Sequence, residues 1–393
     1  MKYSLGFNTW TDSERKSAVN VINSGQYTMG KKVKEFEKKF AKKFRSKYAT
    51  MVNSGSSANL LMLTALKYYK KILKKKITHP NIIVPTIGWS TSYYPIHQNG
   101  FKLVFVDVNE MTLNIDPTEV EKAINKNTVA IMAINLLGNS CNFVELKKIA
   151  KKNNLILIED NCESLGAKYK NKYCGTHGLM ASHSLFFSHH LQTMEGGVIL
   201  TNNKDINDFL KSLRAHGWCR DLPKKNKLYK KSNDKFKDKF IFVTPGYSVR
   251  PLEIEAAIGL VQLKKFDNFL KIRKNNSKVF QNLFDNKNWC KIQKEEKDSI
   301  SSWYGFNIIL SGELKNKRKL IVNKLVKNNI EVRPTMTGNF LKNPVMKFLN
   351  YSAKGKFYKS ENIEKNGFFV GNYPKDLSKE LNFLYKLIEE EIK

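Results

Sequence analysis

The stretch of sequence that decides the fold is SLFFSHHLQTMEGG, residues 184–197. It reads as a short apolar strand entering a polar turn that holds His189 and His190, before Glu195-Gly196-Gly197 leads into a second strand, Val198 to Thr201. Glycine permits the turn, and the strands fix the direction of the histidine side chains. The pattern is that of an imidazole held at a rigid strand end, where acid–base catalysts are often found. A pair of ordinary surface or hydrogen-bonded histidines is the simpler interpretation, and this stretch alone favours it.

Further apolar runs predict strands at Asn81–Pro85, Leu103–Asp107, Ala130–Leu137 and Leu155–Asp160. Helical patterns lie between them at 118–126 and 144–152. Short apolar strands that alternate with helices are typical of a mostly parallel sheet covered on both faces, so the predicted fold class is α/β. Sites in such sheets lie at the carboxyl ends of the strands. Asp160 occupies such an end.

The length of 393 residues indicates a large domain and a smaller one. We expect residues 1–250 to form the large cofactor-binding domain, with residues 1–30 as an irregular arm, and an amphipathic helix from Val33 to Phe44 to follow. Residues 251–393 are predicted to form a smaller α+β domain. Its expected elements are helices at 252–284, 315–328 and 377–392 and strands at 302–310 and 330–334.

Small residues fill the segment Asn53–Asn59 before an apolar helix predicted from Leu60. At a junction between a loop and a helix, exposed backbone N–H groups meet the positive end of the helix dipole, which suits a phosphate. A plain helix cap by Ser54 or Ser56 would explain the same residues.

The formal net charge is +33, much of it in lysine runs at residues 70–76 and 224–239. A nucleic-acid-binding protein is one interpretation. The lysines are spread over nearly every predicted helix, however, and no recognition helix, zinc finger or RNA-binding signature accompanies them. We therefore favour a lysine-biased composition with solvated surfaces and expect no nucleic-acid partner.

Five widely spaced cysteines argue against a disulfide framework and for a reducing compartment. The first 14 residues lack the apolar core of a signal peptide, and the longest apolar run, Val129–Leu137, is too short to span a bilayer. We expect a cytoplasmic protein without a membrane partner. A zinc site is conceivable from Cys174, His177, His183, His189 and His190. Their spacing matches no tetrahedral signature, and no metal is expected.

Four motifs together resemble the DegT/DnrJ/EryC1/StrS sugar aminotransferase family: NSGSSAN at 53–59, EDNCE at 159–163, SLFFSHH at 184–190 and EGG at 195–197. The likeness extends from about Trp10 to Gly371. It implies the fold type I of enzymes dependent on pyridoxal phosphate. In the family's aminotransferases, a lysine six residues before the Glu of the EGG motif holds the cofactor covalently. Here His189 stands in its place. In this respect the chain resembles the branch of the family's sugar 3-dehydratases, which have a histidine at this position.

The resemblance to that branch continues in RAHGW at 214–218, PGY at 245–247, RP at 333–334 and TGNFLKN at 337–343. It implies that pyridoxal phosphate or pyridoxamine phosphate is held without a covalent bond, and that His189 moves the proton. The family's cofactor-binding positions correspond to Gly55, Ser56, Ser57, Trp89, Asp160, Glu163, Ser184 and Ser248. Of these, Asp160 would pair with the pyridine nitrogen, Trp89 would stack on the ring and Glu163 would lie near the ring's 3-oxygen.

Two departures from the family pattern matter. The dehydratases have an asparagine from the second subunit where this chain has Ser248, and a hydroxyl reaches less far than an amide. The CDP-sugar dehydrases carry an iron–sulfur cluster that needs four thiolates. Here Cys162 takes the first position, but Cys219 is the only cysteine of the loop that holds the other three, so no cluster is expected.

The resemblance implies a homodimer with its active site at the interface, which removes the 3-hydroxyl from a nucleotide-linked 4-keto-6-deoxyhexose. GDP-4-keto-6-deoxymannose is the expected substrate, and L-glutamate is the expected amino donor that restores the cofactor. From position and charge, His216, Arg250 and Arg333 are predicted to meet the substrate or the amino donor. A nucleotide-sugar aminotransferase is the alternative within enzymes.

Overall fold

The computed structural model describes residues 2–68, 77–230, 232, 234–238 and 240–392. The lysine run at 70–76 lies outside the described residues, as do Lys231, Asn233 and Lys239 of the second run. No helix in the described part of the chain is long and apolar enough to cross a membrane.

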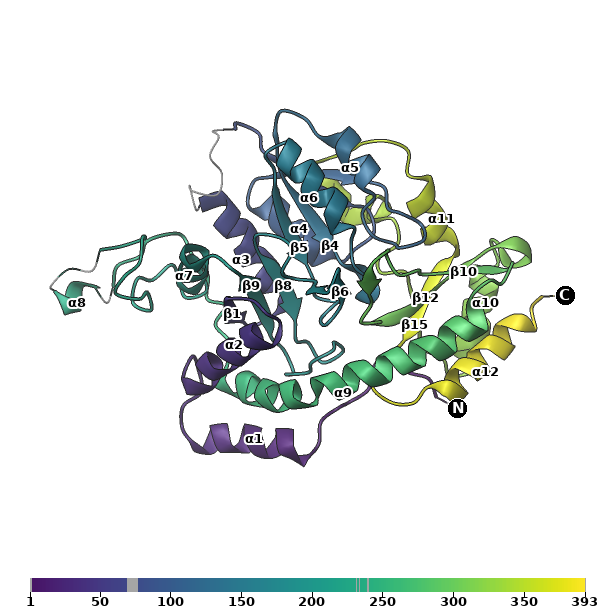
Figure 1. The fold of residues 1–393 in the computed structure, drawn as a ribbon, viewed down its shortest axis with the longest axis horizontal. Helices are drawn as coiled ribbons and strands as arrows, with labels where there is room; N and C mark the ends of the chain where they lie inside the picture. The colour runs from purple at the N-terminus through teal and green to yellow at the C-terminus, as the bar shows by residue number, and fades with distance from the viewer. Residues whose placement is uncertain (1, 69–76, 231, 233, 239, 393) are drawn as a thin grey trace.

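An eight-stranded sheet forms the centre of the molecule (Figure 1). From one edge to the other its strands are β1 (Tyr48–Val52), β9 (Gly197–Thr201), β8 (Ala181–Ser184), β5 (Ile156–Asp160), β4 (Thr128–Ile134), β2 (Asn81–Pro85), β3 (Lys102–Val106) and β14 (Tyr351–Ala353). The pairs from β8 to β14 are parallel, and β9 is antiparallel to both of its neighbours. The predicted mostly parallel α/β sheet is confirmed.

Successive side chains of the central strands enter different cores, since side chains alternate across a sheet. In β2, Ile82 and Val84 pack in one cluster with the apolar faces of α3 (Gly55–Tyr68), α4 (Ser90–Gln98) and α7 (Lys204–Leu213). Ile83, between them, packs in another cluster with α5 (Pro117–Ala123) and α6 (Phe143–Lys152). Burial on both faces explains why these strands read as continuous apolar runs.

The N-terminal segment contains a helix, so the expectation of an irregular arm is wrong. Helix α1 (Asp12–Asn23) begins with a capping box in which the amide and the hydroxyl of Thr11 both donate hydrogen bonds to Oε2 of Glu14. It packs, with α2 (Lys31–Lys43), along the long helix α9 (Glu253–Phe284), as Figure 1 shows. The predicted amphipathic pattern of α2 is confirmed, because Val33, Phe36 and Phe40 are all buried.

The C-terminal part builds a four-stranded antiparallel sheet in the order β10 (Cys290–Ile292), β12 (Gly305–Leu310), β15 (Gly367–Gly371) and β13 (Val332–Pro334). Its helices are α10 (Arg318–Lys327), α11 (Tyr358–Asn366) and α12 (Ser378–Glu389). A three-stranded sheet joins β11 (Ser299–Ile300), β6 (Lys168–Tyr169) and β7 (Lys172–Tyr173). The short helices are η1 (Leu136–Gly138), α8 (Lys235–Asp238), η2 (Gly312–Leu314), η3 (Phe340–Lys342) and η4 (Pro344–Phe348).

The division into domains at residue 250 stays a prediction. Strand β14 comes from the C-terminal part but pairs with β3 in the central sheet. Conversely, Tyr3 of the N-terminal part forms an isolated β-bridge with Ile330 of the C-terminal part. The two parts of the chain are thus joined at several places.

Several element boundaries differ from the prediction by a few residues, and those of β8 and α3 lie at the pocket described below. Strand β8 ends at Ser184, because Leu185–Gly196 folds into a turn closed by hydrogen bonds between Leu185 and Gly196 and between Phe187 and Met194. Helix α3 starts at Gly55 rather than at Leu60, so the small residues of the NSGSSAN motif form its first turn.

Candidate active site

A cavity of about 300 Å³ lies at the carboxyl ends of β4, β5 and β8 and is closed on its other side by residues of the C-terminal part. Most of the residues that line it come from the motifs singled out in the sequence. They are Ser54, Gly55, Ser56, Asn59, Trp89, Thr91, Ser92, Ile134, Asn135, Asp160, Cys162, Glu163, Ser184, Phe186, Ser188, His189, Glu195, Tyr304, Arg333, Met336 and Phe369.

His189 lines this cavity from the turn after β8. Its Nδ1 lies 2.9 Å from the carbonyl oxygen of Cys162, and its ring lies 5.1 Å from the ring of Tyr304 at an angle of 35°. A carbonyl oxygen only accepts hydrogen bonds, so Nδ1 carries the hydrogen and Nε2 of the neutral ring keeps its lone pair. Burial lowers the pKa of His189 to about 4, and the ring is therefore neutral at pH 7.

Asp160 is a buried carboxylate at the end of β5, where the sequence placed it. Its Oδ2 accepts hydrogen bonds from Asn59 Nδ2 at 2.8 Å and from the hydroxyl of Ser92 at 2.7 Å, and its Oδ1 accepts one from the amide of Cys162 at 3.0 Å. These bonds fix the direction of the carboxylate.

Glu159, the preceding residue, points elsewhere. It is fully buried and accepts hydrogen bonds at 2.6 Å from the amides of Gly175, His177 and Gly178. The two adjacent carboxylates therefore have different surroundings, because side chains alternate along the strand. Asp160 contributes to the cavity, and Glu159 holds a loop.

Glu163 lines the cavity close to Asp160 and accepts a hydrogen bond from the amide of Leu137 at 2.9 Å. Leu137 adopts a φ of 51°, which is unusual for a residue with a branched side chain. Removal from water, with the negative charge of Asp160 adding to it, raises the pKa of Glu163 to about 8. At neutral pH this carboxyl group is mostly protonated and can donate a hydrogen bond.

The start of α3 forms another wall of the cavity. The backbone packs closely there, since a Cβ on Gly55 would lie 2.7 Å from the Cβ of Ser184. Gly55, Ser56 and Ser184 line the cavity. Ser57 lies in the same turn, but its amide and hydroxyl both contact Ser54, the residue before the helix. The helix cap by Ser54 that the sequence offered is thus present, and the anion seat stays a prediction.

Trp89 and Arg333 line the cavity from different parts of the chain. Trp89 is 49% exposed and precedes α4 directly, so its indole is available for a ligand. Arg333 comes from β13.

Ser248, His216 and Arg250 do not line this cavity and form a separate group. Arg250 Nη1 lies 2.9 Å from Nε2 of His216, and Ser248 bridges to Ala215. The amide of Asn53 donates a hydrogen bond to the carbonyl of Val249, which places this group beside the start of the NSGSSAN motif.

Sequence reasoning missed several residues of the cavity. Asn59 lies inside the NSGSSAN motif, and its position one turn into α3 could have suggested that it faces the strand ends. Ser92 gave no signal of its own. Tyr304 also gave none, because it reaches the cavity from the start of β12, far away in the chain.

The zinc alternative has no ligand set. Residues 2–68, 77–230, 232, 234–238 and 240–392 contain no group of three or more His, Cys, Asp or Glu placed to hold a metal ion. His177 stacks on Phe143 with its ring centre 4.3 Å away, and His190 is buried with Nε2 3.2 Å from the carbonyl of Ser302.

Comparisons with known proteins agree with this cavity and fold. The chain is 46% identical over 391 residues to a GDP-4-keto-6-deoxy-D-mannose 3-dehydratase of Escherichia coli O55:H7, covering 99% of this chain and 100% of that protein. A solved GDP-4-keto-6-deoxymannose-3-dehydratase with a trapped PLP–glutamate geminal diamine has a TM-score of 0.94 at 46% identity, covering 98% and 100%. A histidine-to-asparagine mutant of such an enzyme with bound GDP-perosamine has a TM-score of 0.94 at 45% identity, with the same coverage.

A sequence profile matches residues 9–382, nearly the whole chain. Together with the relatives above, it confirms the aminotransferase fold that the motifs predicted. The chain belongs to the DegT/DnrJ/EryC1/StrS aminotransferase family.

Proposed function

We propose that the protein is a 3-dehydratase that depends on pyridoxamine phosphate or pyridoxal phosphate and removes the 3-hydroxyl of GDP-4-keto-6-deoxymannose. The observation that carries the proposal is His189, a neutral imidazole whose Nε2 keeps its lone pair in a cavity that also holds Asp160. The relatives described above, named for this reaction and 46% identical, support it.

The residues of the cavity fit such a cofactor. At about 300 Å³ the cavity is at the lower end of the range of small-molecule sites. The N–H groups of Gly55 and Ser56 in the first turn of α3 have no partner within the helix, and together with the hydroxyls of Ser56 and Ser184 they would hold the phosphate. Asp160 would face the pyridine nitrogen and keep it protonated. Trp89 would cover one face of the ring.

Bound pyridoxamine phosphate would supply an amine for the keto carbon of the sugar and a ring that accepts electrons while the 3-hydroxyl leaves. His189 would take a proton at Nε2 and return one. A lysine in its place would bind the cofactor covalently, whereas an imidazole only exchanges protons. With a pKa of about 4 the ring is neutral at pH 7, so its lone pair is free.

Glu163 would donate a hydrogen bond in the same cavity. Its pKa of about 8 keeps the carboxyl group protonated at pH 7, so it suits an oxygen atom with partial negative charge, such as the 3-oxygen of the ring.

A homodimer would complete the site. Ser248, His216 and Arg250 lie outside the cavity of their own chain, and we propose that they face the cavity of the second copy. There, Ser248 would meet the phosphate, and His216 and Arg250 would meet the substrate or the amino donor. Arg333, within the cavity, would bind an anionic group of the sugar nucleotide or of glutamate. L-glutamate would restore the amine of the cofactor after each turnover.

We place the enzyme in the cytoplasm, in deoxysugar biosynthesis. The few, widely spaced cysteines fit a reducing compartment. We propose no metal ion or iron–sulfur cluster, because the loop that would carry three of the four thiolates has only Cys219.

Product analysis tests the proposal. Purified protein is incubated with pyridoxal phosphate, L-glutamate and, separately, GDP-, CDP- or UDP-linked 4-keto-6-deoxy sugars. We expect ammonia and a 3,6-dideoxy-4-keto sugar from the GDP-linked substrate. A stable amino sugar would instead identify a nucleotide-sugar aminotransferase.

A further inference from the structure

The N-terminal segment forms hydrogen bonds with the turn that carries His189. Gln192, three residues after His189, is only 2% exposed. Its Oε1 accepts hydrogen bonds from the amide of Thr9 at 3.0 Å and from its hydroxyl at 2.8 Å, and its Nε2 donates one to the carbonyl of Phe7 at 2.7 Å. Both polar atoms of this side chain are therefore engaged by residues 7–9.

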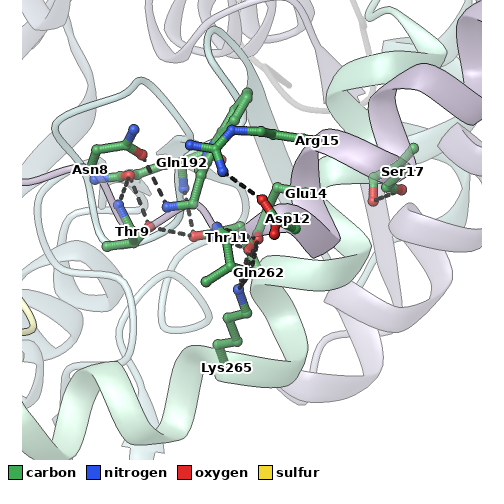
Figure 2. A network of polar contacts seen from close by, with 12 residues as sticks. Asn8, Thr9, Thr11, Asp12, Glu14, Arg15, Ser17, Gln192, Gln262 and Lys265 are labelled. Atoms are coloured by element: carbon green, nitrogen blue, oxygen red, sulfur yellow. Dashed lines mark hydrogen bonds and ion pairs between the residues drawn. The ribbon is translucent and has the colours of Figure 1, made fainter.

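The backbone of Gln192 is held as well. Its carbonyl accepts a hydrogen bond from Nε1 of Trp10 at 2.9 Å, and its amide donates one to Oε1 of Gln262 on α9 at 3.3 Å. Figure 2 shows Thr9, Gln192 and Gln262 in one network of polar contacts. None of these residues lines the cavity.

The network ends in an ion pair between buried Glu14 and partly exposed Lys265. Gln262 Nε2 donates to Oε1 of Glu14 at 2.7 Å, and Lys265 Nζ lies 2.7 Å from the same oxygen (Figure 2). Burial opposes ionisation of Glu14, but hydrogen bonds from Lys265, Thr11 and Gln262 outweigh it and lower its pKa to about 2. The charged network thus anchors the N-terminal segment on α9.

We propose that Gln192 is a positioning residue for His189, and that the N-terminal segment fixes the catalytic turn through it. On the cavity side, the only hydrogen bond of the His189 ring within the described part of the chain is the one from Nδ1 to Cys162. The ring also lies 5.1 Å from the ring of Tyr304 and 6.4 Å from that of Phe186, so its remaining placement depends on these rings and on the backbone of the turn. Because a misplacement of about 1 Å can lower a rate about 100-fold, a rigid turn matters for proton transfer.

This proposal rests on the proposed function, which assigns the proton transfer to His189. Its test therefore includes a measurement that does not depend on the reaction. Gln192→Ala removes the contacts of the side chain with Thr9 and Phe7. Thr9→Val is the milder variant, since it removes one hydroxyl and keeps the shape. Ser17→Ala is the matched control, because Ser17 also ties the N-terminal segment to α9, at 3.1 Å from the carbonyl of Ala257, but does not reach the turn.

Two measurements are made on the full chain. The first is the tautomer of His189, read from the ¹⁵N shifts of its ring nitrogens without substrate and assigned with His189→Asn. We expect the Nδ1–H form in the unmodified protein and in Ser17→Ala, and a mixture of both forms in Gln192→Ala. An unchanged Nδ1–H form in Gln192→Ala would overturn the proposal, whatever reaction the enzyme catalyses.

The second measurement is steady-state kinetics. We expect Gln192→Ala to lower kcat about 10-fold or more and Thr9→Val to lower it less, with KM for the sugar nucleotide within about twofold. Ser17→Ala should keep kcat. Equal losses of kcat in Gln192→Ala and Ser17→Ala, in proportion to their melting temperatures, would show a role in stability alone and would also contradict the proposal.

Discussion

The Nδ1 atom of His189 lies 2.9 Å from the carbonyl oxygen of Cys162, and this contact decides which ring nitrogen can act as a base. Cys162 follows Asp160 by two residues, so one loop fixes both the imidazole and the buried carboxylate. The neighbouring His190 makes a different contact, with Ser302, and does not line the cavity. The two adjacent histidines therefore have different surroundings.

His189→Asn should abolish most of the dehydration. Asparagine has a similar size but exchanges no proton near pH 7, so we expect kcat to fall by roughly 10²- to 10⁴-fold while the sugar nucleotide still binds. Rates of ammonia release and calorimetric binding measure the two effects. His190→Asn is the matched control and should keep kcat within a few fold while lowering the melting temperature. Similar losses of kcat in both variants would contradict the assignment.

His189→Lys should gain a covalent link to pyridoxal phosphate. An ε-ammonium group shifts its pKa readily when it is buried, and a neutral amine reacts with an aldehyde, whereas the imidazole forms no stable bond of this kind. We expect an absorbance band in the visible and, after borohydride reduction, a mass increase of one cofactor. The unmodified protein, treated in the same way, should lose its cofactor on denaturation. Bound cofactor without the band would count against the position of residue 189 in the site.

The sequence located Asp160 and His189 because Asp160 ends a strand and His189 lies in the turn after one, both inside recognisable motifs. It did not predict Tyr304, because the contact between that ring and His189 depends on how the C-terminal part packs against the turn. Strand β14 was missed because its three residues are too few to show a periodic pattern. Helix α1 did have a readable signal, the capping box of Thr11 and Glu14.

Asp160→Asn should weaken cofactor chemistry without unfolding the protein. The amide keeps the shape but loses the negative charge that would hold a proton on the pyridine nitrogen, so we expect activity to fall about 100-fold or more. Glu159→Gln is the matched control at the next position. It should retain cofactor but lose stability, because an NH2 group replaces one of the two oxygens that accept hydrogen bonds from the amides of Gly175, His177 and Gly178, and a buried N–H left without an acceptor costs about 1–3 kcal/mol. Cofactor content and melting temperature separate the two variants, and loss of cofactor from Glu159→Gln alone would reverse the assignment.

Glu163→Gln should change how stability depends on pH. The pKa of Glu163 is raised from 4.5 to about 8 by burial, with the charge of Asp160 adding to the shift. Below pH 4.5 this carboxyl group is protonated in both the folded and the unfolded chain. Between pH 4.5 and about 8 the unfolded chain releases the proton and the folded chain keeps it, so the group disfavours folding increasingly as the pH rises. Above about pH 8 both states are ionised and the difference is constant.

Glutamine does not ionise, so the variant escapes this pH-dependent loss. The melting temperature of Glu163→Gln relative to the unmodified protein, measured without cofactor, should rise by a few degrees from about pH 5 to about pH 8 and then level off. Glutamine also keeps a hydrogen-bond donor in the cavity, so activity at pH 7 should stay within about 10-fold. Glu110→Gln is the control and should show no such rise. Glu110 is partly buried, but hydrogen bonds from Lys291 and Asn362 lower its pKa. A constant difference in melting temperature for Glu163→Gln would mean that this carboxyl group is already ionised at neutral pH.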